Sequence, residues 1–290
     1  MSQGYSEYRF RAQDGLSLYY RAYGDALAEA TPVVCLPGLS RNSKDFHTVA
    51  LRLAARRRVI CPDFRGRGRS DYDPNWQNYQ PTTYVGDMRH LLVAAGIPGA
   101  ALIGTSLGGF VALGLNAMAP GLVAGILLND VGPDVNRGGL KRIADYLSND
   151  VPLPSIDAAA ALLKQRLPDL SFTTEREWLD FADATYRKTD DGTYRFNWDV
   201  NLAKGLQQGK VEIPDLWPLY RAAALRPLLI LRGAKSDVLS AATFERMANE
   251  VPAAMAVTVP GVGHAPHLSE APVAAAIDAW LGAVDAAHHD

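Results

Sequence analysis

Short, continuously apolar runs alternate along this chain with longer amphipathic stretches, and this alternation limits what the chain can fold into. The apolar runs are residues 33–36, 59–61, 101–103, 124–128 and 228–231. The stretches with helical periodicity are residues 43–55, 82–95, 106–118 and 241–249. Continuous apolar runs are typical of parallel strands that helices cover on both faces. The pattern therefore predicts an α/β fold with a doubly wound, mostly parallel sheet.

Two further segments near the N-terminus have a different pattern. In residues 5–12 and 16–22, polar and apolar side chains alternate, and the two segments flank Asp14-Gly15. That dipeptide is favoured in two-residue hairpin turns, so the segments are predicted to form an antiparallel hairpin. With one more strand expected at residues 257–259, the sheet has eight strands.

The region 134–212 does not follow the strand–helix alternation. Helical patterns occur at 140–147, 156–167, 175–186 and 199–207, separated by prolines and by an Asp-Gly pair. We interpret this region as an all-helical cap inserted into a core made of residues 1–133 and 213–290. Such a cap can exclude bulk water from a site beneath it. Two of its aromatic residues, Tyr146 and Trp198, are candidates for an apolar substrate pocket.

Composition limits the possible partners. The chain has 290 residues, 48% of them hydrophobic, and a net charge of −2. Nothing in this balance favours nucleic acid or an anionic membrane as a partner. A cluster of seven arginines at residues 52–69 is interpreted as a solvated helix end at 56–58 followed by a loop. The expected partner is a small-molecule substrate, and the expected assembly is a monomer or a homodimer.

Location and cofactor content follow from the same features. The first ten residues lack an apolar segment, and no stretch approaches 18 consecutive apolar residues, so we expect a cytoplasmic protein without a membrane span. The two cysteines, Cys35 and Cys61, lie in apolar runs and are expected to be reduced core thiols. No metal-ligand spacing is present, so no metal and no other cofactor is expected.

A serine between two glycines is the strongest indication of chemistry. Residues 104–108 read Gly-Thr-Ser-Leu-Gly and join a predicted strand to a predicted helix. A G-x-S-x-G sequence in this context is typical of a nucleophile elbow, in which the backbone is strained and side chains beside the serine have no room. Ser106 is therefore the predicted nucleophile.

A serine hydroxyl becomes nucleophilic only when a base takes its proton. His264 follows the last predicted strand and is the candidate base. A carboxylate must then hold the imidazole in the correct tautomer. We favour Asp237, which also follows a strand, and keep Asp130 as the alternative acid because it follows the preceding strand.

The chain resembles the α/β-hydrolase fold family over nearly its whole length. The matching pieces, in chain order, are residues 36–39 (Leu-Pro-Gly-Leu), 63–70 (Asp-Phe-Arg-Gly-Arg-Gly-Arg-Ser), 104–109 (Gly-Thr-Ser-Leu-Gly-Gly), 232–237 (Arg-Gly-Ala-Lys-Ser-Asp) and 263–270 (Gly-His-Ala-Pro-His-Leu-Ser-Glu). The chain order serine, acid, histidine is also that of the family. One departure is Pro37, which stands where the family commonly has a histidine before the glycine.

The resemblance also implies an oxyanion hole and an activity. The backbone N–H groups of Leu39 and Leu107 would stabilise the developing oxyanion. Asn42 is a candidate for a polar contact with substrate, with a turn role as the alternative. The implied activity is hydrolysis of a small, fairly apolar carboxylic ester or lactone through an acyl-enzyme. Hydrolysis of a carbon–carbon bond in a diketone-like substrate is one alternative, and a weakly catalytic receptor for a small ligand is another.

Overall fold

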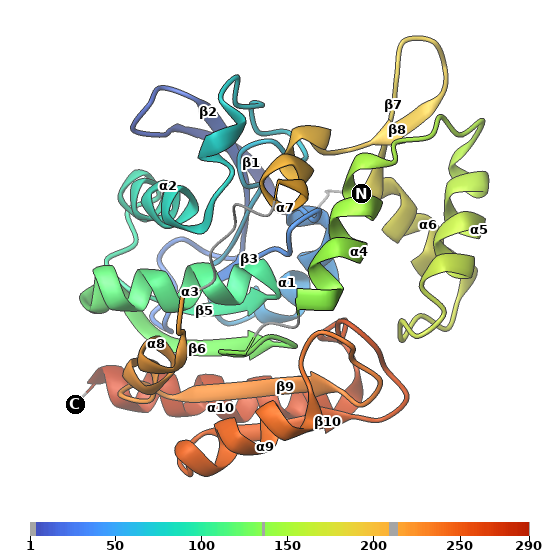
Figure 1. Cartoon of the computed structure of the whole chain (residues 1–290). Helices are drawn as coiled ribbons and strands as arrows, with labels where there is room; N and C mark the ends of the chain where they lie inside the picture. The colour runs from blue at the N-terminus through green and yellow to red at the C-terminus, as the bar shows by residue number, and fades with distance from the viewer. Residues whose placement is uncertain (1–3, 135–136, 209–213, 290) are drawn as a thin grey trace.

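A single twisted sheet organises the molecule (Figure 1). The computed structural model describes residues 4–134, 137–208 and 214–289. The strands of the sheet are β1 (Ser6–Arg11), β2 (Ser17–Tyr23), β3 (Val33–Leu36), β4 (Val59–Pro62), β5 (Ala100–Thr105), β6 (Val123–Asn129), β9 (Leu228–Gly233) and β10 (Met255–Val259). Within the described ranges these eight strands are ordered β1-β2-β4-β3-β5-β6-β9-β10. β2 pairs antiparallel with β1 and β4, and the other neighbours are parallel, which confirms the predicted doubly wound sheet.

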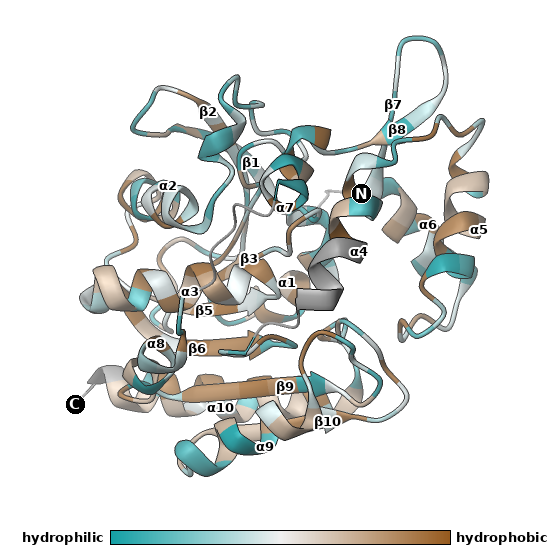
Figure 2. Ribbon diagram, in the orientation of Figure 1, coloured by the Kyte–Doolittle hydropathy of each residue, from teal (hydrophilic) through white to brown (hydrophobic). Residues whose placement is uncertain are grey.

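Helices cover both faces of this sheet. α1 (His47–Leu53) and α10 (Ala271–His289) pack on one face. The helices that pack on the other face are α2 (Pro81–Ala94), α3 (Leu107–Met118), α8 (Trp217–Ala223) and α9 (Ala241–Glu250). Successive strand residues point to opposite faces, so Leu102 of β5 joins one core and Ile103 the other. The central strands are accordingly apolar along their length, and Figure 2 shows them in brown.

The insertion lies between β6 and α8. Its elements are α4 (Arg137–Ser148), α5 (Ile156–Arg166), α6 (Glu175–Thr185), β7 (Tyr186–Lys188), β8 (Tyr194–Phe196), a 3₁₀ turn η4 (Val200–Ala203) and α7 (Lys204–Gln207). The expectation of an all-helical insertion therefore has one exception, the β7–β8 hairpin, which projects from the body in Figure 1. The expected end of the insertion, residue 212, lies outside the described residues.

The hairpin forms because its turn satisfies its own polar groups. Thr189 N donates to Thr193 O over 2.8 Å, and Asp191 Oδ1 accepts a hydrogen bond from Thr193 N. Gly192 has a φ of 84°, a conformation that glycine adopts without steric cost. The Asp-Gly pair therefore closes a β-turn between two short strands.

The insertion has an apolar core of its own. Trp198 is buried there, with its ring stacked on Phe196 at 4.0 Å between centroids. Its indole Nε1 donates a hydrogen bond to Leu147 O over 3.2 Å. Trp178, Tyr186 and Phe196 are buried in the same core.

The arginine cluster is not simply a solvated surface. Arg57, expected at a solvated helix end, is 5% exposed, because it donates hydrogen bonds to Thr31 O and to both carboxylate oxygens of Asp285. Arg65 and Arg67 are also buried. Arg65 pairs with Asp14, Asp73 and Asp87. Paired in this way, these guanidinium groups join chain segments to one another.

No helix in the described ranges combines the length and the apolar character needed to cross a bilayer. Nor do the described residues contain a cluster of three or more histidine, cysteine or acidic side chains suited to a metal ion.

Candidate active site

Ser106 stands at the sharp turn between β5 and α3. Its φ of 51° and ψ of −117° are a strained combination for a residue with a side chain. A Cβ atom on Gly108 would lie 2.1 Å from Leu36 O, and one on Gly104 would lie 2.5 Å from Gly108 O. Both glycines are therefore required by close backbone packing, as the elbow motif predicts.

His264, in the loop after β10, has a buried carboxylate partner. Its Nδ1 lies 2.7 Å from Asp130 Oδ2. Asp130 follows β6 and is fully buried, and its other oxygen accepts a hydrogen bond from Gly233 N over 2.9 Å. A carboxylate at Nδ1 fixes the proton on that nitrogen, which leaves Nε2 as the basic atom of the ring.

The carboxylate that the structure joins to His264 is thus the alternative acid. Asp237, which the sequence favoured, is exposed in the loop after β9 and lines the same cavity as Ser106 and His264. Both acids follow strands near β5, so their spacing in the sequence could not separate them. The direction of Asp130 is set by the backbone amide of Gly233, a contact between two neighbouring strand ends.

The amides expected to form an oxyanion hole belong to the start of α3 and to the loop after β3. Leu107 is the first residue of α3, so its N–H has no acceptor within the helix. Gly38 O accepts a hydrogen bond from Arg41 N over 3.1 Å, and in a trans peptide the N–H of Leu39 points to the opposite side. A Cβ on Gly38 would lie 3.7 Å from Ser106 Cβ, so this loop runs directly beside the serine.

The side chain of Arg67 holds the same loop through a hydrogen bond. Its Nε donates a hydrogen bond to Leu39 O over 2.8 Å, and its Nη1 donates to Tyr84 OH over 2.9 Å. Arg67 is fully buried. Sequence reasoning missed this role, for which an arginine between two glycines was the available signal.

Asn129 is a second residue that sequence reasoning missed. It is fully buried, and its Nδ2 donates to Thr105 Oγ1 over 3.0 Å and to Pro266 O over 2.9 Å. Its backbone O accepts from Ser106 N. Asn129 therefore ties the serine turn to the loop that carries His264. A polar residue at the end of an apolar strand was the available signal.

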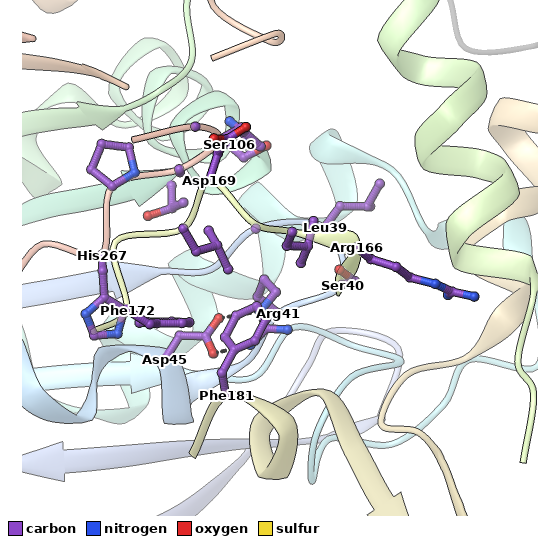
Figure 3. Close-up of a pocket in the computed structure, with 18 of the residues that line it drawn as sticks. Leu39, Ser40, Arg41, Asp45, Ser106, Arg166, Asp169, Phe172, Phe181 and His267 are labelled. Carbon is purple, nitrogen blue, oxygen red and sulfur yellow. Dashed lines mark hydrogen bonds and ion pairs between the residues drawn. The ribbon is translucent and has the colours of Figure 1, made fainter. Parts of the chain in front are cut away.

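Above these residues lies a cavity of about 610 Å³ (Figure 3). Ser106, His264 and Leu39 line it, as does Tyr146 of α4. Further lining side chains from the insertion are Ile143, Leu147, Arg166, Leu167, Leu170, Phe172 and Phe181. The part of the lining that the insertion supplies is therefore largely apolar.

Two expected pocket residues lie elsewhere. Neither Asn42 nor Trp198 is among the described residues that line the cavity. Trp198 is held in the core of the insertion, as described above. Asn42 Nδ2 donates to Ala184 O over 2.7 Å, and its Oδ1 accepts from Lys44 N at the start of a 3₁₀ turn. The alternative turn role of Asn42 is thus the one its contacts fit.

His267, the neighbour of His264 in sequence, packs against the insertion. Its ring meets the ring of Phe172 edge-on at 4.8 Å, and its backbone N–H donates to Glu270 Oε1 ahead of α10. Asp169 makes a second link, because its O accepts from Gly263 N and its Oδ1 pairs with Lys235 Nζ. The insertion therefore contacts the histidine loop directly.

Comparisons with known proteins agree with this geometry. A profile described as the Alpha/beta hydrolase family matches residues 33–278. A "3-hydroxybutyrate-oligomer hydrolase" of Cupriavidus necator is 33% identical over 255 residues, which cover 85% of this chain and 86% of that protein. A "2-(acetamidomethylene)succinate hydrolase" of Mesorhizobium japonicum is 29% identical over 231 residues, which cover 78% of this chain and 79% of that protein.

A solved structure extends the likeness to three dimensions. The crystal structure of an alpha/beta hydrolase from Novosphingobium aromaticivorans superposes with a TM-score of 0.90 at 41% identity, covering 96% of this chain and 98% of that one. The profile match spans most of the chain, including the serine elbow and the histidine loop. The chain is a hydrolase that belongs to the alpha/beta hydrolase family.

Proposed function

We propose that this protein is a serine hydrolase that cleaves carboxylic esters with the triad Ser106, His264 and Asp130. The observation that carries the proposal is the 2.7 Å contact between His264 Nδ1 and Asp130 Oδ2 in the cavity where Ser106 stands at its strained turn. Asp130 replaces Asp237 as the proposed acid because it is buried and directed at the imidazole.

The chemistry follows from these positions. His264 Nε2 takes the proton of Ser106 Oγ as that oxygen attacks the ester carbonyl carbon. Negative charge develops on the carbonyl oxygen, and the N–H groups of Leu39 and Leu107 stabilise it, each by about 3 kcal/mol. His264 then gives the proton to the leaving alcohol. Water, activated by the same nitrogen, hydrolyses the acyl-enzyme.

The substrate class that we propose is a short oligoester of small hydroxy acids. The relative from Cupriavidus necator, similar along most of both chains, acts by its name on 3-hydroxybutyrate oligomers. The cavity has room for such a small chain, and its apolar wall suits short alkyl groups.

We also propose the domain boundaries and the cellular location of the protein. Residues 134–212 act as the cap of the site, and residues 1–133 with 213–290 form the core. Lining residues from α4, from the segment after α5 and from α6 support this division. Cytoplasmic placement is supported by the two cysteines, Cys35 and Cys61, which form no disulfide and suit a reducing compartment.

Ser106 labelling tests the proposed function. The wild-type protein is expected to hydrolyse p-nitrophenyl butyrate and to be labelled covalently by a fluorophosphonate, since both reactions need an activated serine. Ser106→Ala should abolish both reactions. Ester hydrolysis is followed by the absorbance of the released p-nitrophenolate, and labelling is followed by the intact mass of the protein. A folded wild-type protein that neither reacts with the probe nor cleaves the ester would contradict the proposal.

A further inference from the structure

The cavity that Ser106 lines also contains a guanidinium that is fixed in place. Arg41 lines the cavity, and its side chain is 15% exposed. Asp45 accepts hydrogen bonds from its Nε and Nη2, and Thr185 Oγ1 accepts from Nη1, all at 2.6 Å. Its guanidinium also lies over the ring of Phe181, 3.9 Å from the centroid. Figure 3 shows these two side chains next to each other. Arg41 is therefore held in a single orientation.

These contacts leave part of the guanidinium unused. Arginine has five N–H groups, and Asp45 and Thr185 take three of them. One N–H on each terminal nitrogen of Arg41 has no acceptor in the part of the chain that the structure describes. The hydrogen bonds to Asp45 and Thr185 hold the loop against the insertion. They do not account for the two remaining N–H groups of Arg41. Because Arg41 lines the cavity, these donors are available to a bound ligand.

Tyr146 adds another donor to this cavity. It lines the cavity, and its hydroxyl has no hydrogen-bond partner among residues 4–134, 137–208 and 214–289. Burial raises the pKa of Tyr146, so the hydroxyl keeps its proton near neutral pH. Arg41 and Arg166 line the same cavity as this phenol, and their guanidinium groups oppose that rise in pKa.

Arg166, the last residue of α5, supplies positive charge without a partner. Of the other two described cations in the lining, Arg41 pairs with Asp45 and Lys235 pairs with Asp169. Arg166 forms no ion pair within the described residues. Arg166 is exposed, and in Figure 3 its side chain extends away from Ser106.

We propose that Arg41, Tyr146 and Arg166 form a subsite that binds a carboxylate, so that the preferred substrate is an ester with a free acid group. The inference rests on the proposed esterase function and adds the group that the enzyme recognises. A carboxylate has only acceptors, and a fixed guanidinium matches its two oxygens. Donors without acceptors in a partly closed cavity are suited to such a group.

The distance to the serine is compatible with this binding. The Cβ position of Gly38 lies 3.3 Å from Arg41 Cγ and 3.7 Å from Ser106 Cβ. The root of the Arg41 side chain is therefore close to the nucleophile. In a dimer of a 3-hydroxy acid, the free carboxylate is only a few bonds from the ester oxygen. Because both residues line one cavity, we expect one small substrate to contact both, and the released hydroxy acid keeps the carboxylate.

Two matched substrates test the subsite. One is the linear dimer of 3-hydroxybutyrate with a free acid end, and the other is the same dimer with that end converted to a primary amide. For the wild-type enzyme we expect kcat/KM to be about tenfold to a hundredfold higher for the acid, as expected for hydrogen bonds to a charged group. Tyr146→Phe, Arg166→Met and Arg41→Lys should each lower kcat/KM for the acid, mainly through KM, and change it little for the amide.

The amide dimer shows whether a variant still folds and reacts, and Arg176→Met is the matched control. Arg176 is an exposed residue of α6 and is not among the described residues that line the cavity. Arg176→Met therefore removes one positive charge from the insertion and leaves the charge of the cavity unchanged. Its acid preference should equal that of wild type. As a second measurement, free 3-hydroxybutyrate should inhibit wild-type hydrolysis of p-nitrophenyl butyrate competitively, and Arg166→Met should weaken that inhibition.

The outcomes separate the subsite from the function. Equal use of both dimers by wild type, cleavage of neither dimer alongside hydrolysis of p-nitrophenyl butyrate, or equal losses on both dimers in the three variants would overturn the subsite. Each of those results leaves the serine hydrolase in place. A lack of fluorophosphonate labelling at Ser106 would instead remove the proposed function.

Discussion

The carboxyl group of Asp130 is fully buried between two neighbouring strand ends, whereas Asp237 is exposed at the cavity wall. Asp130 has one oxygen on Gly233 N and the other on His264 Nδ1. A carboxylate held by two donors keeps the imidazole in one orientation, which is what catalysis by a histidine base requires. At the residue scale, burial and direction therefore support Asp130 as the proposed acid, and residue type alone does not separate it from Asp237.

Exchanging each acid for its amide tests this assignment. Asp130→Asn should lower kcat for p-nitrophenyl butyrate by roughly 10³-fold or more. An asparagine amide favours the wrong tautomer of the His264 imidazole and does not stabilise the imidazolium that forms during the reaction. Asp237→Asn is the matched control and should change kcat far less. Rates measured on variants with wild-type melting temperatures decide the matter. A larger loss in Asp237→Asn than in Asp130→Asn would return the acid to Asp237.

Two loops act together at the scale of structural elements. The loop after β3 carries Leu39, and the loop after β4 carries Arg67, whose Nε holds Leu39 O. The family commonly has a histidine before Gly38, and Pro37 stands in that place here. In this chain a buried arginine from the neighbouring loop supplies a hydrogen bond to the loop that carries Leu39. We propose that Arg67 is a positioning residue that acts through the backbone of Leu39.

Arg67→Lys tests that role. A lysine keeps the charge but lacks the fork that reaches Leu39 O and Tyr84 OH together. We expect kcat to fall by at least about tenfold, which corresponds to about 1.4 kcal/mol of transition-state stabilisation, with KM little changed. Arg69→Lys, at a partly exposed position in the same loop, is the control. A purely structural role would lower the melting temperature of Arg67→Lys without this selective loss of kcat.

At the scale of the whole molecule, α10 packs on one face of the sheet and contacts Arg57, which lies just before β4. Asp285 of α10 accepts hydrogen bonds from Arg57 and from Thr31 N. Partial burial raises the pKa of Asp285, but the hydrogen bonds from Arg57 and Thr31 outweigh it and hold the pKa below the usual value of 3.8. The C-terminal helix is therefore joined to the N-terminal half of the chain by an ion pair.

The pH dependence of stability follows from the sign of that shift. Because the pKa of Asp285 is lower in the folded state, its stabilisation is complete above about pH 4 and is lost as the pH falls through the folded value. Asp285→Asn should lower the free energy of unfolding by about 1 kcal/mol near neutral pH, a small value because solvent screens the pair. Urea unfolding at pH 7 and at pH 3 checks this. The difference between variant and wild type should shrink at pH 3, and an unchanged difference would contradict it.

Local patterns were sufficient for much of the molecule. The apolar runs became the central strands, and the alternating segments became the β1–β2 hairpin, because each reflects the burial of one or both faces of a strand. The elbow around Ser106 was also readable, since the close approach of Leu36 O to Gly108 leaves room only for glycine. These features depend on residues near one another in sequence or on a repeating period.

Contacts between distant segments decided the rest. The partner of His264 is 134 residues away, and the choice of Asp130 depends on where one loop places an amide. Trp198 packs inside the insertion while Tyr146 faces the cavity, although both are aromatic residues of the same region. Arg57 and Arg67 are buried because carboxylates and carbonyl groups from other segments surround them.

The sequence by itself determined the doubly wound sheet and the strained serine turn, because periodicity and glycine spacing express physical limits that act along a short stretch of chain. Only the tertiary structure decided which carboxylate joins His264 and which donors of Arg41 have acceptors among the described residues. Hydrogen bonding and burial at those positions depend on groups brought together by folding, and their direction in space is not encoded in spacing along the chain.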